Sequence, residues 1–466
     1  MRSITIVGAG VAGLTIAHQL AESGYDVTVI EANATVGGLA RTFHYGDFHF
    51  DVGPHRFHTE SPRTAAFIRR ILGPEAIEIP RRSGARMFGR IHEWPLRPAM
   101  LASMPPGVMV RCARDLLVRQ HAEGDSFAAD VINKYGRTLF EIFFEPYTQK
   151  FLSHSSHELH RDWARAGVNR AVIDRRAQAD NLLGLLRTTL LPKPVETTFL
   201  YPPHGVGRFS DLLAAAIVRM GGRIMTSAPV TAVEAEGSTI RAVRVGTVRI
   251  PSSQLVWTAP VSLLNRLLGV ENIDLQFLST IFYNVEVTKP PRSPYQWTYF
   301  GGTEVFSRVT APEAFLPSTT PPGCSGLCAE VTCFEGDSRW RNAEDLTGKI
   351  VGELASTGML GSTADVRAVH VEHVPNTYPI YKLNYPDELA RTLRVLGGYR
   401  NLLLAGRSGR FWYNNMDHSI GQGLTMAERI RRGDALAEID PADREFWTEV
   451  DEPALVPTLR PSEVEK

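Results

Sequence analysis

Ile4-Thr-Ile-Val7-Gly8-Ala-Gly10-Val-Ala-Gly13-Leu14 is the stretch that decides the fold of this chain. Its apolar run ends in a G-x-G-x-x-G turn, and apolar residues then follow at helical spacing from Leu14 as far as Ser23-Gly24. The pattern predicts a strand, a tight turn and a helix. Backbone N–H groups at the start of such a helix bind anions, so we expect a dinucleotide pyrophosphate at Gly8, Gly10 and Gly13.

An acidic residue, two glycines and a cation follow this unit. A second apolar run, from Val27 to Ile30, ends in Glu31, whose carboxylate can accept hydrogen bonds from a ribose. Gly37, Gly38 and Arg41 come next, as expected if backbone and a guanidinium approach the pyrophosphate from a second side. The alternative is an apolar β-α-β unit that binds no ligand.

Length and composition exclude several classes of partner. At 466 residues the chain is long enough for about two or three structural units. Its 50 basic and 50 acidic residues balance, which argues against nucleic acid or an anionic membrane as the main partner. No apolar run reaches the roughly 18 to 20 residues that a membrane span needs. The glycine-broken N-terminal run is expected to be the nucleotide unit and not a signal peptide.

The four cysteines show neither a C-x-x-C pair nor a zinc-type spacing. They predict reduced thiols in a cytoplasmic protein, and no metal site. These residues are Cys112, Cys324, Cys328 and Cys333.

The glycine turn, Glu31 and the Gly37-Gly38-x-x-Arg41 stretch together resemble the FAD-binding flavoproteins of the amine oxidase and protoporphyrinogen oxidase type. The resemblance implies one FAD, bound noncovalently. It also implies further cofactor contacts, from Val230, Gly406, Met416 and Asp417.

Hydrophobic periodicity predicts an α/β fold in which the FAD-binding domain is discontinuous. Residues 64–200 are mainly helical in period, apart from a short hairpin from Arg86 to Leu96, and should form an inserted unit with substrate contacts. Residues 282–372 alternate as antiparallel strands do, and residues 266–395 should form an antiparallel β-sheet substrate domain. The remaining segments should be a Rossmann-like FAD-binding domain, from 1–63, 201–265 and 396–439, with a helix from Ser419 onward, and a peripheral tail, 440–466.

Four further stretches are similar to the nucleotide-sugar pyranose/furanose mutases typified by UDP-galactopyranose mutase. They match that family's G-x-H-x-F-H-T, its Y-T-x-K, its substrate tyrosine and its G-R-x5-Y-x-x-M-D. In this chain the stretches are Gly53-Pro-His55-Arg-Phe57-His58-Thr59, Tyr147-Thr148-Gln-Lys150, Tyr378-Pro-Ile-Tyr381 and Gly406-Arg407-x5-Tyr413-Asn-Asn415-Met416-Asp417.

The resemblance implies a role for each of these residues. His58 would tune the flavin and pass a proton, with His55 beside it. Arg308 and Arg407 would bind the substrate diphosphate, and a third arginine would be Arg165 or Arg170. The remaining substrate contacts would be Thr148, Leu152, Tyr378, Tyr413 and Asn415. Two of them depart from the family, because Leu152 replaces a tryptophan and Asn415 replaces an aspartate.

The function implied is an FAD-dependent nucleotide-sugar mutase with no net redox change, in which reduced flavin N5 attacks the anomeric carbon. NAD(P)H could be the external reductant. The main alternative is an FAD-dependent oxidase or desaturase of the protoporphyrinogen oxidase or amine oxidase type, and a flavin-holding protein without catalysis is a third. The nucleotide, the sugar and the oligomeric state stay open.

Overall fold

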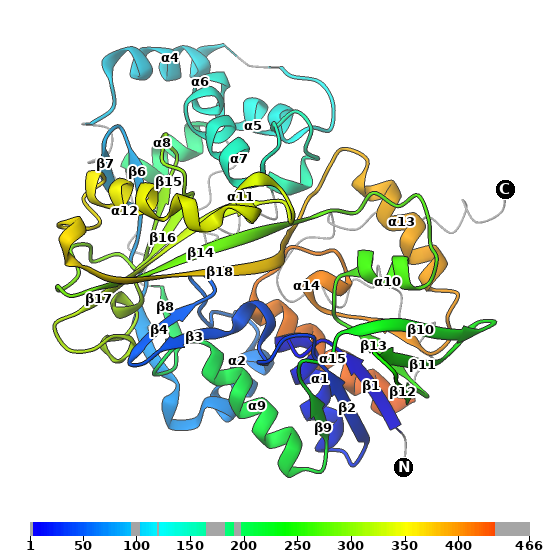
Figure 1. Ribbon diagram of the computed structural model, residues 1–466. Coiled ribbons are helices and arrows are strands. Elements are labelled where there is room, and N and C mark those ends of the chain that lie inside the picture. The colour runs from blue at the N-terminus through cyan, green and yellow to red at the C-terminus, as the bar shows by residue number, and fades with distance from the viewer. Residues whose placement is uncertain (1–2, 95–102, 119–120, 165–181, 191–196, 434–466) are drawn as a thin grey trace.

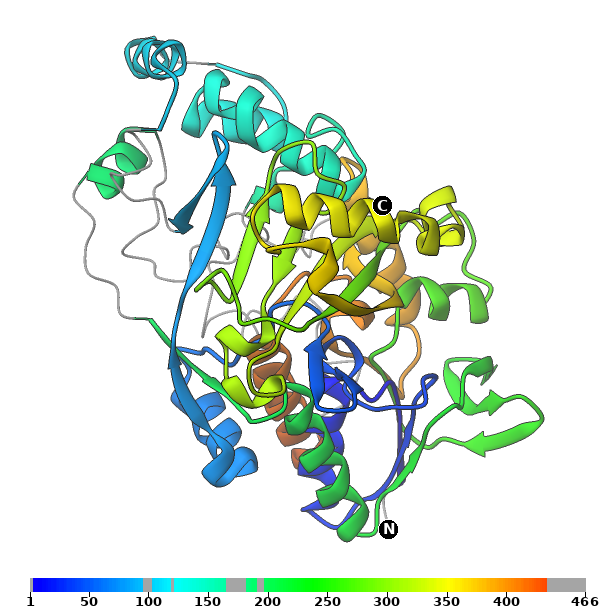
Figure 2. The ribbon, with the colours of Figure 1, turned by 60° about the vertical axis from the view of Figure 1, so that its left-hand side comes forward.

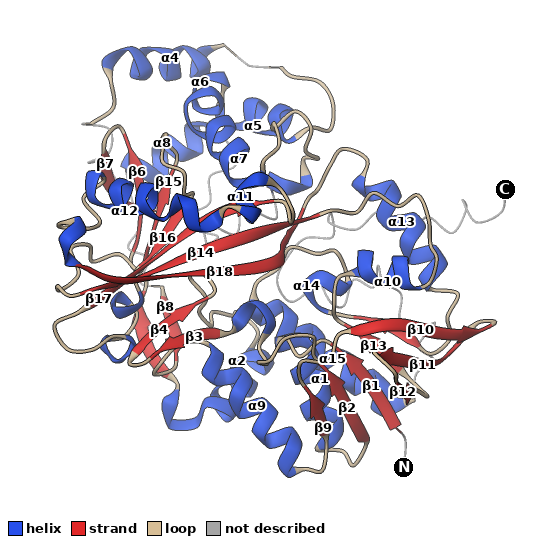
Figure 3. Cartoon of the chain, in the orientation of Figure 1, coloured by secondary structure: helices blue, strands red, loops and turns tan. Residues whose placement is uncertain are grey.

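The computed structural model describes residues 3–94, 103–118, 121–164, 182–190 and 197–433. Three layers follow one another along its long axis (Figure 1). A parallel sheet with its helices lies at one end, a large mixed sheet crosses the middle, and a group of helices covers the other end. Figure 3 shows the two sheets as separate groups of strands.

The predicted Rossmann-like unit is a five-stranded parallel sheet in the order β19-β13-β1-β2-β9. Its strands come from three separated parts of the chain, because β13 and β19 extend the sheet on the other side of the N-terminal strand β1. Their bounds are Ser3–Val7 (β1), Asp26–Ile30 (β2), Arg223–Met225 (β9), Leu255–Trp257 (β13) and Leu402–Leu404 (β19).

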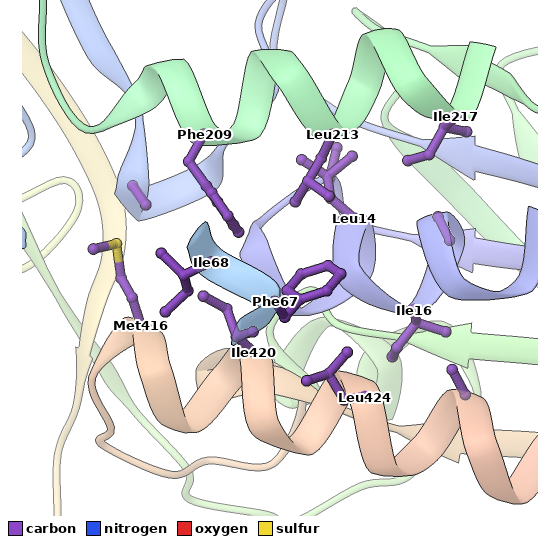
Figure 4. Packing of buried hydrophobic residues seen from close by; sticks show 14 of the residues in the cluster. Leu14, Ile16, Phe67, Ile68, Phe209, Leu213, Ile217, Met416, Ile420 and Leu424 are labelled. Carbon is purple, nitrogen blue, oxygen red and sulfur yellow. The ribbon is translucent and has the colours of Figure 1, made fainter. Parts of the chain in front are cut away.

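Helices pack on this sheet through one apolar core, part of which is drawn in Figure 4. Full burial of each large apolar side chain contributes roughly 1.5–3 kcal/mol. The labelled side chains interdigitate between the helices, and they are Leu14, Ile16, Phe67, Ile68, Phe209, Leu213, Ile217, Met416, Ile420 and Leu424. The helices are α1 (Val11–Ala21), α2 (Pro62–Leu72), α9 (Gly207–Arg219) and α15 (Met416–Arg432).

Helices α1 and α15 approach closely because Gly423 faces Thr15. A Cβ atom at Gly423 would lie 2.9 Å from the Thr15 Cβ, which is shorter than a van der Waals contact. Asn415 caps α15: its side chain accepts from the backbone of His418, and the His418 side chain accepts in turn from the Asn415 backbone. The helix therefore starts at Met416, three residues before Ser419, where its start was predicted.

The middle layer is a seven-stranded sheet in the order β18-β14-β17-β16-β15-β6-β7. All its pairs are antiparallel except β15 with β6, which is parallel. The strand bounds are Ser83–Met87 (β6), Arg90–Trp94 (β7), Phe277–Val287 (β14), Trp297–Phe300 (β15), Arg308–Thr310 (β16), Ser325–Cys333 (β17) and Val366–Pro379 (β18).

Two expectations about this sheet need correction. The hairpin assigned to the helical insertion is β6–β7, and it belongs to the sheet because β6 pairs with β15. The alternation expected of half-exposed strands is also absent from β14 and β17, which are buried at every position. Helix α12 (Thr347–Ser356) covers one face through Ile350 and Leu354, and the segment with Phe48 and Phe50 packs on the other.

The helical end of the molecule is linked to the parallel sheet by a second core. Figure 2 shows its helices beyond the middle sheet. They are α4 (Pro106–Leu117), α5 (Phe127–Tyr135), α6 (Arg137–Leu139), a π-helical turn (Phe140–Phe144), α7 (Glu145–Leu152) and α8 (Leu182–Leu190).

Smaller elements complete the fold. Helices α10 (Val261–Leu267), α11 (Ser338–Arg341), α13 (Tyr385–Leu396) and α14 (Gly406–Gly409) lie in the connections. The remaining strands form one three-stranded and two two-stranded sheets: β10 (Val230–Glu236) with β11 (Thr239–Val245) and β12 (Val248–Pro251), β3 (Thr42–Tyr45) with β4 (Phe48–Asp51), and β5 (Ile77–Pro80) with β8 (Thr198–Tyr201).

None of the described helices is both long and apolar enough to cross a membrane. All four cysteines are free thiols. Within the described ranges, no group of histidine, cysteine and acidic side chains is arranged to hold a metal ion.

Candidate active site

The turn after β1 is a cradle that only glycine can form. Gly8 has a φ of 102°, and a Cβ there would lie 2.3 Å from Thr258 Oγ1. A Cβ at Gly13 would lie 2.1 Å from the Gly8 carbonyl oxygen. Gly10 has no atom near the place of a Cβ, and its backbone lines a cavity. The turn therefore brings bare backbone to the N-terminus of α1, as a pyrophosphate requires.

The second side of the cradle comes from the turn after β2. Gly37 and Gly38 have positive φ values of 103° and 56°, and Gly37 forms an isolated bridge with Gly10. Buried Glu31 accepts a hydrogen bond from the Ala9 N–H at 2.8 Å. Arg41 lines the same cavity, and burial lowers its pKa although Glu31 and Glu372 act to raise it.

These residues enclose a cavity of about 460 Å³. Its size and its glycine-rich wall fit a dinucleotide cofactor. Most of the predicted cofactor contacts line it: Gly8, Gly10, Glu31, Gly37, Gly38, Arg41, Val230, Gly406 and Met416. The other two predicted contacts are Gly13, which packs against the turn from within α1, and Asp417, which is buried with its Oδ1 3.2 Å from His418 Nδ1.

Of the two predicted catalytic histidines, His55 lines this cavity. Its Nδ1 is buried without a hydrogen-bond partner among the described residues. Burial and, after it, the charges of Arg407, Arg308 and Arg56 together lower the His55 pKa to about 3. His55 is therefore neutral at physiological pH, with a ring nitrogen left for a ligand.

His58 lies on the side of the segment that faces β8. Its Nδ1 is 3.4 Å from the Thr198 carbonyl oxygen, and its ring meets the Phe199 ring edge-on with centroids 5.8 Å apart. Burial lowers its pKa. The sequence motif favoured His58 as the proton-carrying residue, whereas the geometry brings His55 to the cavity wall.

Arg308 forms a buried, two-pronged ion pair. Its Nε and Nη2 donate to the two carboxylate oxygens of Glu330 at 2.7 and 2.6 Å, and Nη2 also donates to the Tyr378 hydroxyl at 3.1 Å. Glu330 is 0% exposed and the Arg308 side chain 14%. Burial acts to lower the Arg308 pKa, but Glu330 outweighs it and holds the pKa well above its usual value.

Gly53 allows the Arg308–Glu330 ion pair to pack against the segment that contains His55. Its φ is 75°, and a Cβ there would lie 3.2 Å from both Arg308 Nη2 and Glu330 Oε1. The segment with His55 is therefore packed directly on the middle sheet.

Arg407 is held by backbone carbonyl groups. It donates from Nε to the Asn414 oxygen at 3.1 Å, from Nη2 to the same oxygen, and from Nη1 to the Thr377 oxygen at 3.2 Å. Its guanidinium carbon lies 4.9 Å from the Tyr413 ring centroid. Arg407 and Asn415 both line the cofactor cavity, so this arginine stands where cofactor and substrate sites would meet.

Aromatic rings connect these arginines to α7. The Tyr378 ring lies 5.6 Å from Tyr413 and 4.8 Å from Phe151, measured between centroids. Thr148 and Leu152 stand on the same helix, and both are buried, Leu152 fully within the second core. Leu152 is thus a packing residue in this structure. Arg165 and Arg170 lie outside the described residues.

Three residues of this site were not predicted. Arg56 stands inside the quoted G-x-H-x-F-H-T stretch at a variable position, and Arg81 precedes β6. Glu330 stands in an apolar strand, where a lone acid between Ala329 and Val331 is a signal of a buried partner.

The sequence matches the family described as "Flavin containing amine oxidoreductase" over residues 11–431. A "Probable UDP-galactopyranose mutase" of Klebsiella pneumoniae is 29% identical over 162 residues, which are 32% of this chain and 40% of that protein. L-amino acid oxidase Cdc18 of Crotalus durissus cumanensis is 42% identical over 69 residues, which are 15% of this chain and 14% of the oxidase. These matches span less than half of either relative.

Two solved structures extend the likeness to nearly the whole fold. A reduced UDP-galactopyranose mutase superposes with a TM-score of 0.80 at 20% identity, over 95% of this chain and 98% of that one. Cyclohexylamine oxidase from Brevibacterium oxydans IH-35A has a TM-score of 0.61 at 14% identity, over 93% and 99%. Both show a shared fold. Since the family match covers most of its length, the chain belongs to the flavin-containing amine oxidoreductases and is a flavoenzyme of that superfamily.

Proposed function

We propose that this flavoenzyme is an FAD-dependent mutase that interconverts the pyranose and furanose forms of a nucleotide-linked sugar without net redox change. One observation carries the proposal: two arginines act on His55, which lines the cofactor cavity, and each of them contacts a tyrosine. They are Arg308, Tyr378, Arg407 and Tyr413. This is a setting for an anionic substrate group.

A diphosphate suits this group of side chains. The diphosphate must be held while its bond to the sugar is broken and remade, so both charge and position matter. Glu330 fixes the direction of Arg308, and the Asn414 and Thr377 carbonyl groups fix that of Arg407. Both guanidinium groups are therefore positioned before substrate arrives.

When bound in its reduced form, FAD would supply the nucleophile toward the anomeric carbon. The chain's own residues would bind the diphosphate, exclude water with aromatic rings and provide a neutral imidazole. With a pKa of about 3, His55 would be a neutral hydrogen-bond acceptor at neutral pH and could not start as an imidazolium proton donor. Proton transfer through His58 stays a prediction.

The fold shared with a reduced UDP-galactopyranose mutase and the partial match to the Klebsiella protein support this proposal. The L-amino acid oxidase match and the fold of cyclohexylamine oxidase favour the second candidate, an FAD-dependent oxidase or desaturase. The arginines argue against an apolar or purely cationic oxidase substrate, which has no use for them, whereas an amino acid has a carboxylate that they could bind.

The test is to titrate the reduced, flavin-bound protein without oxygen with UDP, dTDP, GDP and ADP, and to record the flavin absorption. We expect one of them to change the spectrum. Arg407→Met should weaken that binding by about ten- to a hundredfold, as the loss of a charge-assisted hydrogen bond does. If none of the four binds and an amine or amino acid reduces the oxidised flavin instead, the oxidase candidate replaces the mutase.

A further inference from the structure

Arg56 and Arg81 share one aromatic platform next to the proposed site. The Arg56 guanidinium carbon lies 4.6 Å from the Trp297 ring centroid and 5.2 Å from that of Phe199. The Arg81 guanidinium carbon lies 5.7 Å from the same Trp297 ring. Two guanidinium groups are thus gathered at one indole, and Arg81 also donates to the Ser83 hydroxyl and interacts with Glu93.

Arg56 has donor capacity left for a ligand. A guanidinium has five N–H donors, and the hydrogen bond that the described residues provide is from Nη1 to the Pro54 oxygen at 3.0 Å. No salt bridge joins Arg56 to an acid in the described part of the chain. Burial lowers its pKa, and Arg308 acts in the same direction while Tyr299, Tyr413 and Asp417 oppose it. The group nevertheless keeps its charge.

Arg56 lies at a different place along β15 from the Arg308–Glu330 pair. Tyr299 of β15 is the cross-strand neighbour of Arg308, and Trp297 precedes it by two residues on the same face of the strand. One such step is roughly 7 Å. Arg308 already has a carboxylate partner, whereas Arg56, one step further along the sheet, has none among the described residues.

We propose that Arg56, supported by Trp297 and Arg81, is a second oxyanion site, which binds a carboxylate or phosphate carried by the sugar in addition to the diphosphate. The planar guanidinium would grip two oxygen atoms of that group. The inference rests on the proposed function where it calls the ligand a nucleotide sugar. It narrows the substrate class to acidic sugars, such as a hexuronate or a sugar phosphate.

The experiment uses the flavin-bound protein and isothermal titration calorimetry. UDP, UDP-glucose and UDP-glucuronate are compared, because the last two differ by the sugar carboxylate alone. The parent protein should bind UDP-glucuronate at least about tenfold more tightly than UDP-glucose. Arg56→Met should remove this preference and leave the affinity for UDP within about twofold. Arg69→Met, which changes an arginine with a 56% exposed side chain, is the matched control and should leave all three affinities unchanged.

A second arm needs no nucleotide. Glucuronate, glucose 6-phosphate and glucose are titrated, and at least one of the two acidic sugars should bind through Arg56 more tightly than glucose does. The comparison of the two acidic sugars shows whether the site prefers a carboxylate or a phosphate. Equal affinity for UDP-glucuronate and UDP-glucose, with no binding of either acidic sugar, overturns the oxyanion site. So does an Arg56→Met protein that loses UDP and UDP-glucuronate binding equally, since Arg56 would then serve the diphosphate.

Failure of the proposed function gives a different binding result from failure of the oxyanion site. If no nucleotide binds but an acidic sugar does so through Arg56, the oxyanion site stands and the nucleotide-sugar assignment fails. Flavin absorption and near-ultraviolet circular dichroism show whether Arg56→Met is folded. If it is not, Arg81→Met replaces it and should reduce the preference for the acidic sugar, whereas an undiminished preference in that variant overturns the proposal.

Discussion

Glu330→Leu should destabilise the protein far more than loss of an ordinary hydrogen bond does. The glutamate is 0% exposed and neutralises Arg308 through contacts of 2.7 and 2.6 Å. Removing one member of a buried pair leaves the other charge without a partner, which costs about 3–5 kcal/mol. Arg308→Met should cost a similar amount, because it leaves the carboxylate buried.

The double variant Arg308→Met/Glu330→Leu should be much closer to the parent. It removes both charges, and the remaining loss is the hydrogen bond from Arg308 to the Tyr378 hydroxyl, about 1 kcal/mol. The two single losses add to at least about 6 kcal/mol, so the coupling between the residues should be about 5 kcal/mol or more.

Urea unfolding of the flavin-bound proteins at 25 °C, followed by tryptophan fluorescence with free FAD held constant, measures these free energies. Arg70→Met is the control, because Arg70 forms an exposed ion pair with Glu22 and its loss should cost less than about 1 kcal/mol. A double variant that is destabilised by the sum of the two single changes would refute this account of the pair.

Three further predictions concern the cofactor cradle and buried titratable groups. Gly13→Ala should abolish flavin binding, seen as loss of the visible flavin absorption, because its Cβ would meet the Gly8 oxygen at 2.1 Å, whereas Gly352→Ala has open space and should keep the flavin. His55 has a pKa of about 3 when folded and 6.5 when unfolded, so the unfolded state binds the extra proton between these values. The parent should therefore lose stability relative to His55→Asn as the pH falls from 6.5, by on the order of 2–3 kcal/mol at pH 4.5, and parallel pH curves would refute this. Burial raises the Glu313 pKa from 4.5 to about 7, so the fold loses stability as the pH rises from 4.5 to 7, and the full loss is present above 7. Glu313→Gln should then be more stable than the parent at pH 8 by on the order of 3 kcal/mol and gain nothing below pH 4.5, and an equal gain at both pH values would show that charge is not the cause.

The nucleotide-binding unit could be predicted because its information is local. Gly8, Gly37 and Gly38 have positive φ values, and there is no room for a side chain at Gly13. Each turn therefore requires glycine at positions that lie close together in the sequence. The start of α15 was placed three residues late because Asn415 and His418 cap it reciprocally, a signal that the quoted motif hid.

The middle sheet and its ion pair are long-range features. Strand β6 pairs with β15, which lies more than two hundred residues further along the chain. The sequence of neither strand indicates that the other is its partner. The sequence pointed to Arg308 as a diphosphate ligand but not to Glu330, since only the register of β16 against β17 brings the two together. The resemblance favoured His58 over His55, but the sequence did not predict which of them lines the cavity, because the side on which each histidine lies depends on β8 and the cavity.

The central claim is isomerisation of a nucleotide sugar with no net redox change. It is tested most directly by counting product against reductant with FAD, and then with 5-deaza-FAD, in which carbon replaces N5 while hydride transfer remains possible. The nucleotide sugar is the one whose nucleotide perturbs the flavin spectrum, and NADH or dithionite supplies the electrons.

We expect many molecules of ring-isomerised sugar for each molecule of reductant oxidised. Activity should be present only when the FAD is reduced, and it should be absent after reconstitution with 5-deaza-FAD. Consumption of one oxidant for each product formed, or isomerisation by the 5-deaza protein, would contradict the account.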